Sequence, residues 1–329
     1  MLTIPKKAAH RYLGLLAAAF AVFCGASQAQ TYPSKPVRFI VPWPPGGIAD
    51  TRSRSLAQCV SQSWGQQVVV DNKPGASGTI GVDLIAKAKP DGYTVGFISA
   101  NDMAIAKPMG LPLAYDPEKD LIPITQFTRT PIVLVAAPTV PVDSARALAH
   151  WAKAQGGKVT YGSPGVAHTN HFAIEEFNRD AGITGTHIPY KGEAAMLPDV
   201  IAGRVAYAYA YAATVDPLVK AGRLKALMVT GSVRSPQVPN VPSAVEAGFP
   251  EADMDSWGGL AGPAGLAREV VTRLHAEWSR CLRSAEVRTR REFLDAQIIA
   301  SSPAEFQVFL RAERARWNRL VKETAIRPE

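Results

Sequence analysis

The sequence predicts an α/β protein with two domains of the same class, and three observations support this prediction. Short β-branched runs alternate with segments of helical apolar spacing along most of the chain. Apolar residues make up 47% of the 329 residues and charged residues 19%, which is enough for a sizeable core. A proline-punctuated stretch at 111–119 precedes a new set of alternating elements. This alternation favours a parallel, doubly wound sheet in each domain, with the loops after the strands gathered at one edge.

Residues 1–29 have the features of a secretory signal peptide. Lys6, Lys7 and Arg11 precede an apolar run that ends at Phe23, and small residues follow it. This run is too short for a convincing membrane span. The full chain has a formal net charge of +8, and removal of the segment would take away three of its basic residues. The modest excess of positive charge that remains weakly favours acidic ligands and does not indicate binding to nucleic acid.

A proline-glycine turn follows the first predicted strand. Pro44 and Pro45 fix the backbone, and Gly46 and Gly47 let it turn closely before a helical segment begins. Backbone N–H groups at the start of that helix would face the turn and could bind an anion. The turn lacks the Gly-Lys-Ser/Thr ending of a P-loop and the spaced glycines of a dinucleotide site. The pattern therefore favours a carboxylate over a nucleotide, and an ordinary strand-to-helix turn fits it equally well.

A second glycine-rich turn lies at Asp71–Thr79, between a β-branched strand and another helix. The second domain is predicted to contain strands at 132–137, 159–161, near 188 and at 224–230, and helices at 144–154, 169–181 and 216–221. Two helical segments between 268 and 320 end the chain.

Two cysteines remain after the predicted signal peptide, Cys59 and Cys281. Both fall in predicted helices that are far apart in the sequence. A disulfide that ties the last part of the chain to the first helix and two separate buried thiols fit the sequence equally well.

Several motifs resemble those of the substrate-binding proteins of tripartite tricarboxylate transporters, the Bug or TctC-like receptors. They include the segment from Tyr32 to the first turn, and four further segments at 70–81, 89–94, 187–192 and 238–248. The resemblance covers essentially the whole chain after the signal peptide, in order. It implies a periplasmic protein that captures a small carboxylate and delivers it to a membrane transporter, without enzymatic activity, cofactor or metal.

The resemblance also implies the type II fold of periplasmic binding proteins. In this fold two doubly wound α/β lobes are joined by a two-strand hinge and close on ligand like a Venus flytrap. We expect lobe 1 to comprise residues 30–125 and 233–329, and lobe 2 to comprise residues 126–232. We expect the protein to be a monomer.

Carried over by position, the resemblance implies a set of ligand contacts in the cleft. They are Pro44, Gly46, Gly47, Ile48, Gly78 and Thr79 from lobe 1, and Ser163, Gly165, His168, Thr169, Tyr190 and Ala210 from lobe 2. Asp50 is predicted to hold its own loop, because a second negative charge beside a bound carboxylate is unfavourable.

Three departures from the family pattern bear on the choice of ligand. Ile48 replaces a small hydroxyl residue, and Ala167 and His168 stand where glycine and then serine or threonine are usual. The strand at 206–211 lacks an aspartate that could meet a ligand amine. An amino-acid ligand is therefore disfavoured, and a bulky or aromatic carboxylate is favoured, with apolar walls from Ile48, Trp43 and tyrosines.

Other functions remain open at this point. The same chain could be an orphan receptor that feeds a sensor kinase. A secreted serine hydrolase would use Ser163 with His168 or His171, but Tyr161 occupies the first glycine position of a nucleophile elbow. A metal site at His168, His171 and Glu175 is disfavoured, because a helix cap and a packed helix residue account for the two histidines.

Overall fold

The structure is a computed structural model that describes residues 32–323 and 326, and Lys35–Glu329 form one compact unit. The predicted signal peptide lies outside the described residues. The strands of this unit form two sheets, one of six strands and one of five. Each sheet with its helices makes one lobe, so the predicted two-lobed α/β class is confirmed.

The sheet of lobe 1 has the order β11-β4-β10-β3-β1-β2 and is mixed. Its strands are β1 (Val37–Val41), β2 (Val68–Asn72), β3 (Thr94–Ser99), β4 (Leu121–Thr130), β10 (Ser256–Pro263) and β11 (Gln297–Ile298). β1 pairs in parallel with β2 and β3, whereas β10 runs antiparallel to both β3 and β4. The sequence predicted a wholly parallel sheet, because periodicity marks where strands lie but not the direction in which they run.

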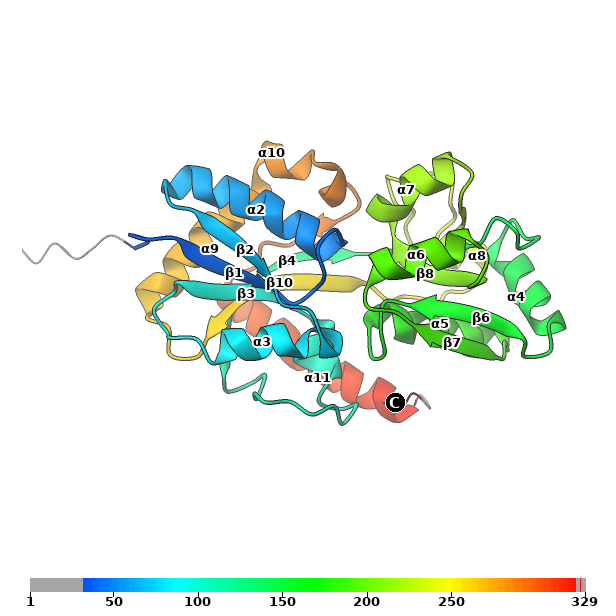
Figure 1. Ribbon diagram of the computed structural model, residues 1–329, viewed down its shortest axis with the longest axis horizontal. Helices are drawn as coiled ribbons and strands as arrows, with labels where there is room; N and C mark the ends of the chain where they lie inside the picture. The colour runs from blue at the N-terminus through cyan, green and yellow to red at the C-terminus, as the bar shows by residue number, and fades with distance from the viewer. Residues whose placement is uncertain (1–31, 324–325, 327–329) are drawn as a thin grey trace, which may run out of the picture. The chain divides into compact units, whose positions relative to one another are not determined.

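Helices cover both faces of this sheet. They are α2 (Ile48–Trp64), α3 (Thr79–Ala86), α9 (Arg268–Arg283), α10 (Ala285–Arg288) and α11 (Pro303–Glu323), with short helical turns at Ala76–Gly78, Asn101–Ile105 and Arg291–Phe293. In Figure 1, α2 lies above the sheet, and α3 and α11 lie below it. The fully buried Trp278 of α9 packs edge-on against Phe39 and stacks on Phe127 of β4, with ring centroids 4.5 Å and 5.6 Å apart. This aromatic cluster fixes α9 on the sheet.

The sheet of lobe 2 has the order β7-β6-β8-β5-β9 and is mixed as well. Its strands are β5 (Ile132–Ala136), β6 (Val159–Ser163), β7 (Gly185–Pro189), β8 (Tyr207–Tyr211) and β9 (Lys225–Val229). Its helices are α4 (Ala145–Ala154), α5 (Thr169–Ala181), α6 (Glu193–Ile201), α7 (Ala212–Lys220) and α8 (Ala244–Ala247). The tyrosines of β8 belong to one apolar cluster, and Ala208 and Ala210 belong to another on the opposite face.

The chain passes between the sheets twice. Only Pro131 separates β4 from β5, and the chain returns between α8 and β10. The lobe boundaries predicted from the sequence, at 125/126 and 232/233, stay a proposal. Residues 126–130, which were assigned to lobe 2, are part of β4 in the sheet of lobe 1. Helix α8, which was assigned to lobe 1, packs beside β9 of lobe 2.

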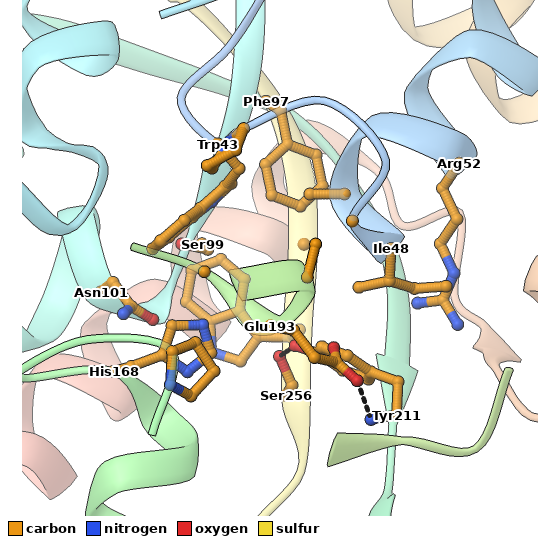
Figure 2. Close-up of a pocket in the computed structure, with 18 of the residues that line it drawn as sticks. Trp43, Ile48, Arg52, Phe97, Ser99, Asn101, His168, Glu193, Tyr211 and Ser256 are labelled. Atoms are coloured by element: carbon orange, nitrogen blue, oxygen red, sulfur yellow. Dashed lines mark hydrogen bonds between the residues drawn. The ribbon is translucent and has the colours of Figure 1, made fainter. Parts of the chain in front are cut away.

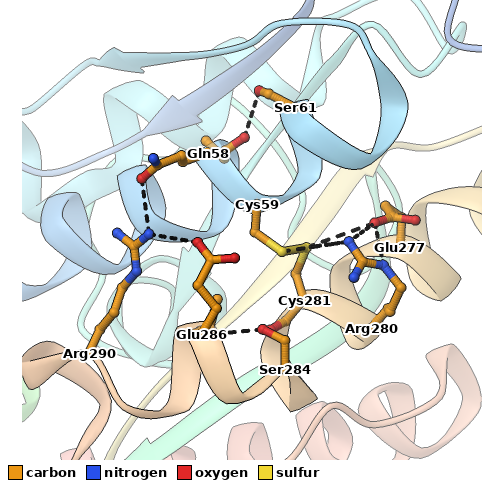
Figure 3. The surroundings of a disulfide bond; sticks show 11 residues. Gln58, Cys59, Ser61, Glu277, Arg280, Cys281, Ser284, Glu286 and Arg290 are labelled. Atoms are coloured by element: carbon orange, nitrogen blue, oxygen red, sulfur yellow. Dashed lines mark hydrogen bonds and ion pairs between the residues drawn. A yellow bond between two sulfur atoms is a disulfide. The ribbon is translucent and has the colours of Figure 1, made fainter.

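A disulfide joins Cys59 of α2 to Cys281 of α9, with the two Cα atoms 5.9 Å apart. Figure 3 shows it between the two helices, beside the ion pair of Arg280 and Glu277. The structure thus decides between the two alternatives that the sequence left open. The bridge ties together segments that are 222 residues apart in the chain.

Candidate ligand-binding pocket

The turn between β1 and α2 is shaped by its glycines and by Asp50. Gly46 has a φ of +84°, which an L side chain rarely adopts, and Gly47 precedes α2 without a side-chain cap. Asp50 Oδ2 accepts a hydrogen bond from Gly46 N (3.0 Å), and its Oδ1 accepts one from Asn72 Nδ2 (2.9 Å). Asp50 thus holds its own loop, as predicted. The first N–H groups of α2 have no partners inside the helix, and no side chain caps them.

A second helix start, from lobe 2, faces the same space. Gly192 precedes α6 with a φ of +100° and provides no side-chain cap. A Cβ atom on Gly192 would lie 3.4 Å from Pro44 Cγ, so glycine allows the two turns to approach closely. The starts of α2 and α6 both line one pocket. Two helix dipoles therefore present their positive ends to it.

Figure 2 shows this pocket between the lobes. Its apolar wall consists of Trp43, Ile48, Phe97, Phe127, Trp257 and Phe293, with Pro44, Pro45 and Pro164. Its polar lining includes Arg52, Ser99, Asn101, Thr128, His168, Lys191, Glu193, Tyr211 and Ser256. A concave wall of apolar and aromatic side chains that also carries polar groups is typical of a small-molecule site.

Side chains from both lobes meet around the pocket. The rings of Trp43 and His168 pack edge-on, with centroids 5.2 Å apart. Ser77 Oγ donates to Val166 O (2.7 Å), and the hydroxyls of Tyr211 and Ser256 are hydrogen-bonded at 2.6 Å. These contacts link the lobes directly at the rim of the pocket.

His168 is an uncharged cap of α5. Its Nδ1 accepts a hydrogen bond from Asn170 N (3.1 Å), and burial lowers the pKa of its side chain to about 3. At neutral pH the ring therefore presents no positive charge to an anion in the pocket. Its contributions are a ring face beside Trp43 and the cap.

A buried ion pair stands behind Ile48. Arg52, one helical turn later in α2, donates to Thr130 Oγ1 (2.8 Å) and lies 3.3 Å from Asp295 Oδ1. Burial raises the pKa of Asp295, and the positive charge of Arg52 opposes that rise. Arg52 is buried and is part of the pocket wall, so the pocket contains a guanidinium group besides the two helix starts.

The buried carboxyl group of Glu193, the first residue of α6, also lines the pocket. Its Oε1 accepts a hydrogen bond from Tyr211 N (3.0 Å), which Figure 2 shows. Burial raises the pKa of Glu193 to about 8. A group with such a pKa holds its proton at neutral pH and can donate a hydrogen bond.

Four of the predicted contacts lie in the pocket wall: Pro44, Gly47, Ile48 and His168. The other eight lie nearby or behind the wall. Gly46 forms the turn, Gly78 and Thr79 begin α3, and Gly165 and Thr169 lie on either side of His168. Ser163 ends β6, Tyr190 donates to Asp199, and Ala210 is buried in β8. As ligand contacts, all twelve stay predictions.

Ser163 has a histidine partner, but it is His187 and not His168 or His171, the two expected from the sequence. Its Oγ lies 2.7 Å from His187 Nε2, and the ring of His187 stacks on His171 with centroids 3.8 Å apart. Burial lowers the pKa of His187 to about 4. Ser163 is fully buried and is not part of the pocket wall, so a substrate in the pocket would not meet its hydroxyl group.

Most of the side chains that form the pocket were not predicted from the sequence. Arg52 had a local signal, because it lies one helical turn after Ile48 on the same face of α2. Glu193 had one too, directly after the glycine of a helix start. The aromatic residues Phe97, Phe127 and Trp257 had no local signal. They come together only because the register of β3, β4 and β10 places the neighbouring residues Ser99, Thr128 and Gly258 side by side.

No group of three or more metal-ligating side chains occurs within residues 32–323. In the same part of the chain, no helix combines the length and the apolar character that a membrane span requires.

The family model described as the tripartite tricarboxylate transporter family receptor matches residues 53–326. Protein BugT of Bordetella pertussis is 33% identical over 298 residues, which cover 90% of this chain and 91% of BugT. A solved structure of R. palustris Rpa4515 with adipate is 32% identical, has a TM-score of 0.87, and the match covers 91% of this chain and all of that one (100%). The structure of MatC from Rhodopseudomonas palustris with bound malate is 29% identical and has a TM-score of 0.82. The match covers 88% of this chain and 100% of MatC.

Proposed function

Because the chain belongs to the family of tripartite tricarboxylate transporter receptors, we propose that its pocket captures a small carboxylate in the periplasm for delivery to a membrane transporter. One observation supports this most strongly. The uncapped starts of α2 and α6, one from each lobe, line the same pocket. Backbone N–H groups at two helix starts favour an anion at that point.

The apolar wall supports a ligand with an apolar body. Trp43, Ile48 and Phe97 lie on the lobe 1 side, and a charged ligand end would gain nothing from them. Relatives with solved structures carry adipate and malate, both of which are dicarboxylates. We therefore propose a carboxylate with an apolar middle, and not an amino acid.

Binding can be tested on the mature protein, unfolded and refolded to remove ligand carried over from expression. Adipate, malate, benzoate and aspartate would be compared by thermal shift and then by calorimetry. A ligand that binds the native state raises the melting temperature. We expect adipate or benzoate to stabilise the protein more than aspartate does.

A matched pair of variants tests the location of the site. Ile48→Asp places a negative charge at the first position of α2, which the helix dipole tolerates but a bound carboxylate does not. We expect a loss of affinity of at least about tenfold. Ile80→Asp makes the same change on α3, where Ile80 is 52% exposed and outside the pocket wall, and should leave affinity unchanged. Equal affinity in both variants would place the ligand elsewhere.

The absence of catalysis is part of the proposal. We expect no hydrolysis of ester panels, because the hydroxyl of Ser163 is fully buried. Turnover that disappears in Ser163→Ala would contradict this. If deletion of the receptor gene abolished ligand-dependent gene induction without a defect in uptake, a sensor kinase would be favoured as partner.

A further inference from the structure

A loop of lobe 2 is held by lobe 1 through its backbone. The loop consists of residues 164–168, connects β6 to α5 and contributes to the pocket wall. Ser77 Oγ, from the turn before α3, donates to Val166 O at 2.7 Å, and Asn101 Nδ2 donates to Ala167 O at 3.3 Å. Both acceptors are main-chain carbonyl groups, so these bonds join the lobes whatever side chains the loop carries.

Asn101 is enclosed between the lobes. It is 3% exposed, and its Oδ1 accepts a hydrogen bond from Thr169 Oγ1 at 3.4 Å. Figure 2 shows it on the same side of the pocket as Trp43 and His168, whose rings pack edge-on across the lobe boundary. The two lobes therefore contact each other here through their own side chains and backbone.

Both segments have a strained backbone where they meet. Among the residues that the structure describes, four residues other than glycine have a positive φ, and three of them belong to this contact. They are Ala76 (+46°) and Ser77 (+52°) in lobe 1 and Ala167 (+62°) in lobe 2. Such conformations are unfavourable for L residues and persist only where the surroundings impose them, commonly at clamps and switches. The hydrogen bonds from Ser77 and to Ala167 are part of those surroundings.

Lobe 2 braces the same loop from behind. Ser163 Oγ accepts a hydrogen bond from Gly165 N (3.2 Å) and lies 2.7 Å from His187 Nε2. Ala167 N donates to His171 Nδ1 at 3.4 Å. The loop is thus fixed to the body of lobe 2, so a bond from lobe 1 to the loop restrains the lobe as a whole.

We propose that Ser77 and Asn101 form an interlobe latch, which keeps part of the ligand-free protein closed and slows the release of a bound ligand. Ser77, Val166 and Ala167 are not part of the pocket wall, so Ser77 acts on the position of the lobes and not on the ligand. This inference goes beyond the proposed function, because it concerns how the lobes close and not which compound they capture.

Two opposing effects set the balance of the latch. Closure gains the hydrogen bonds of Ser77 and Asn101, each of which changes an equilibrium constant by a factor of about five. Closure also imposes the positive φ angles of Ser77 and Ala167, which opening allows to relax. Because the two effects are of similar size, we expect the ligand-free protein to populate both closed and open lobes.

Distances between the lobes test the latch without any ligand. Gln62 of α2 and Ala195 of α6 are exposed, belong to different lobes and lie outside the pocket wall. Gln62→Cys and Ala195→Cys can be spin-labelled while the native disulfide stays intact. Double electron–electron resonance on ligand-stripped protein should then show two distance populations. Ser77→Ala should reduce the ratio of closed to open protein by about fivefold.

Two further variants separate the hydrogen bond from strain and from general stability. Ser77→Gly removes the hydroxyl but adopts a φ of +52° without strain, so its closed population should lie between those of Ser77→Ala and the wild type. Ser61→Ala is the matched control. Ser61 Oγ donates to Ala57 O (2.6 Å) and accepts from Val68 N (2.8 Å), both within lobe 1. Its loss should lower stability and leave the distances between the lobes unchanged.

Stopped-flow fluorescence with adipate as the probe measures ligand release. Ser77→Ala should release adipate about fivefold faster than the wild type. Its affinity should fall by less than the dissociation rate rises, because open lobes also admit the ligand faster. Loss of a direct ligand contact would instead change mainly the dissociation rate. Ser61→Ala should leave both rates as they are in the wild type.

Identical distances between the lobes in ligand-free wild type and Ser77→Ala would overturn the latch, and so would an equal shift in Ser61→Ala. A closed population in Ser77→Gly no larger than that in Ser77→Ala would overturn the role of strain. If neither adipate nor the other carboxylates bind, the proposed function fails, while the distances in the ligand-free protein still decide the latch.

Discussion

The two ends of the pocket are built in different ways. At one end, the starts of α2 and α6 offer backbone N–H groups from two glycine turns. At the side-chain end, Arg52, Glu193 and Tyr211 come from α2, α6 and β8, and because Glu193 is the first residue of α6, the two ends adjoin at that helix start. The backbone end suits any small anion, because every carboxylate can use the same N–H groups. The side-chain end can distinguish one carboxylate from another, because its hydrogen bonds and charges belong to particular residues.

The largest expected effect concerns the buried ion pair of the side-chain end. Arg52→Met leaves Asp295, whose side chain is fully buried, without its partner. We expect a loss of about 3–5 kcal/mol in the free energy of unfolding. Arg54→Met on the same helix is the matched control, because Arg54 is 52% exposed in its pair with Asp50 and should contribute at most about 1 kcal/mol. Denaturant unfolding of both variants would measure this difference. Similar losses of unfolding free energy in Arg52→Met and Arg54→Met would show that the backbone end and the side-chain end tolerate changes in charge equally.

The second prediction concerns the dependence of stability on pH. The pKa of Glu193 is about 8 in the folded protein and has an ordinary value of 4.5 in the unfolded chain. The folded state therefore holds a proton that the unfolded state has released, so stability falls as the pH rises from about 4.5 to 8. Glu193→Gln should reduce this slope. Part of the slope will remain, because burial also raises the pKa of Asp102, to about 7.

Melting temperatures across that pH range would check the second prediction. A slope that is unchanged in Glu193→Gln would mean that Glu193 is ionised in the folded protein. The side-chain end would then carry a negative charge, and its difference from the backbone end would be sharper than proposed.

The smallest expected effect concerns the hydrogen bond between the lobes at the side-chain end. Tyr211→Phe removes the hydroxyl that bonds Ser256 Oγ at 2.6 Å, and should weaken ligand binding by about fivefold. Tyr207→Phe is the control, since its hydroxyl bonds Asn178 Oδ1 at 2.7 Å inside lobe 2. It should lower stability and leave affinity unchanged. Calorimetry on both variants would measure this, and equal affinities would show that the Tyr211 hydroxyl does not support the bound state.

The same contrast explains how much the sequence could predict. The backbone end was predictable, because Pro44, Gly46 and Gly47 determine a local conformation and Asp50 reaches only its own turn. The alternation along β8 likewise follows from residues that are neighbours in the chain. The tertiary arrangement of the side-chain end was not predictable. Arg52 and Asp295 are 243 positions apart, and Oε2 of Glu193 lacks a partner only because of how three elements pack.

The disulfide between α2 and α9 has a consequence for the order in which the protein forms. Strands β5–β9 follow one another in the chain, so lobe 2 can fold as soon as it has been synthesised. Lobe 1 must wait, because β10, α9 and α11 arrive only after all of lobe 2. Cys59 therefore has no disulfide partner during synthesis until Cys281, 222 residues further along the chain, has been made. The covalent bond that fastens α2, the helix that begins at the pocket, thus depends on a residue made after both lobe 2 and most of lobe 1.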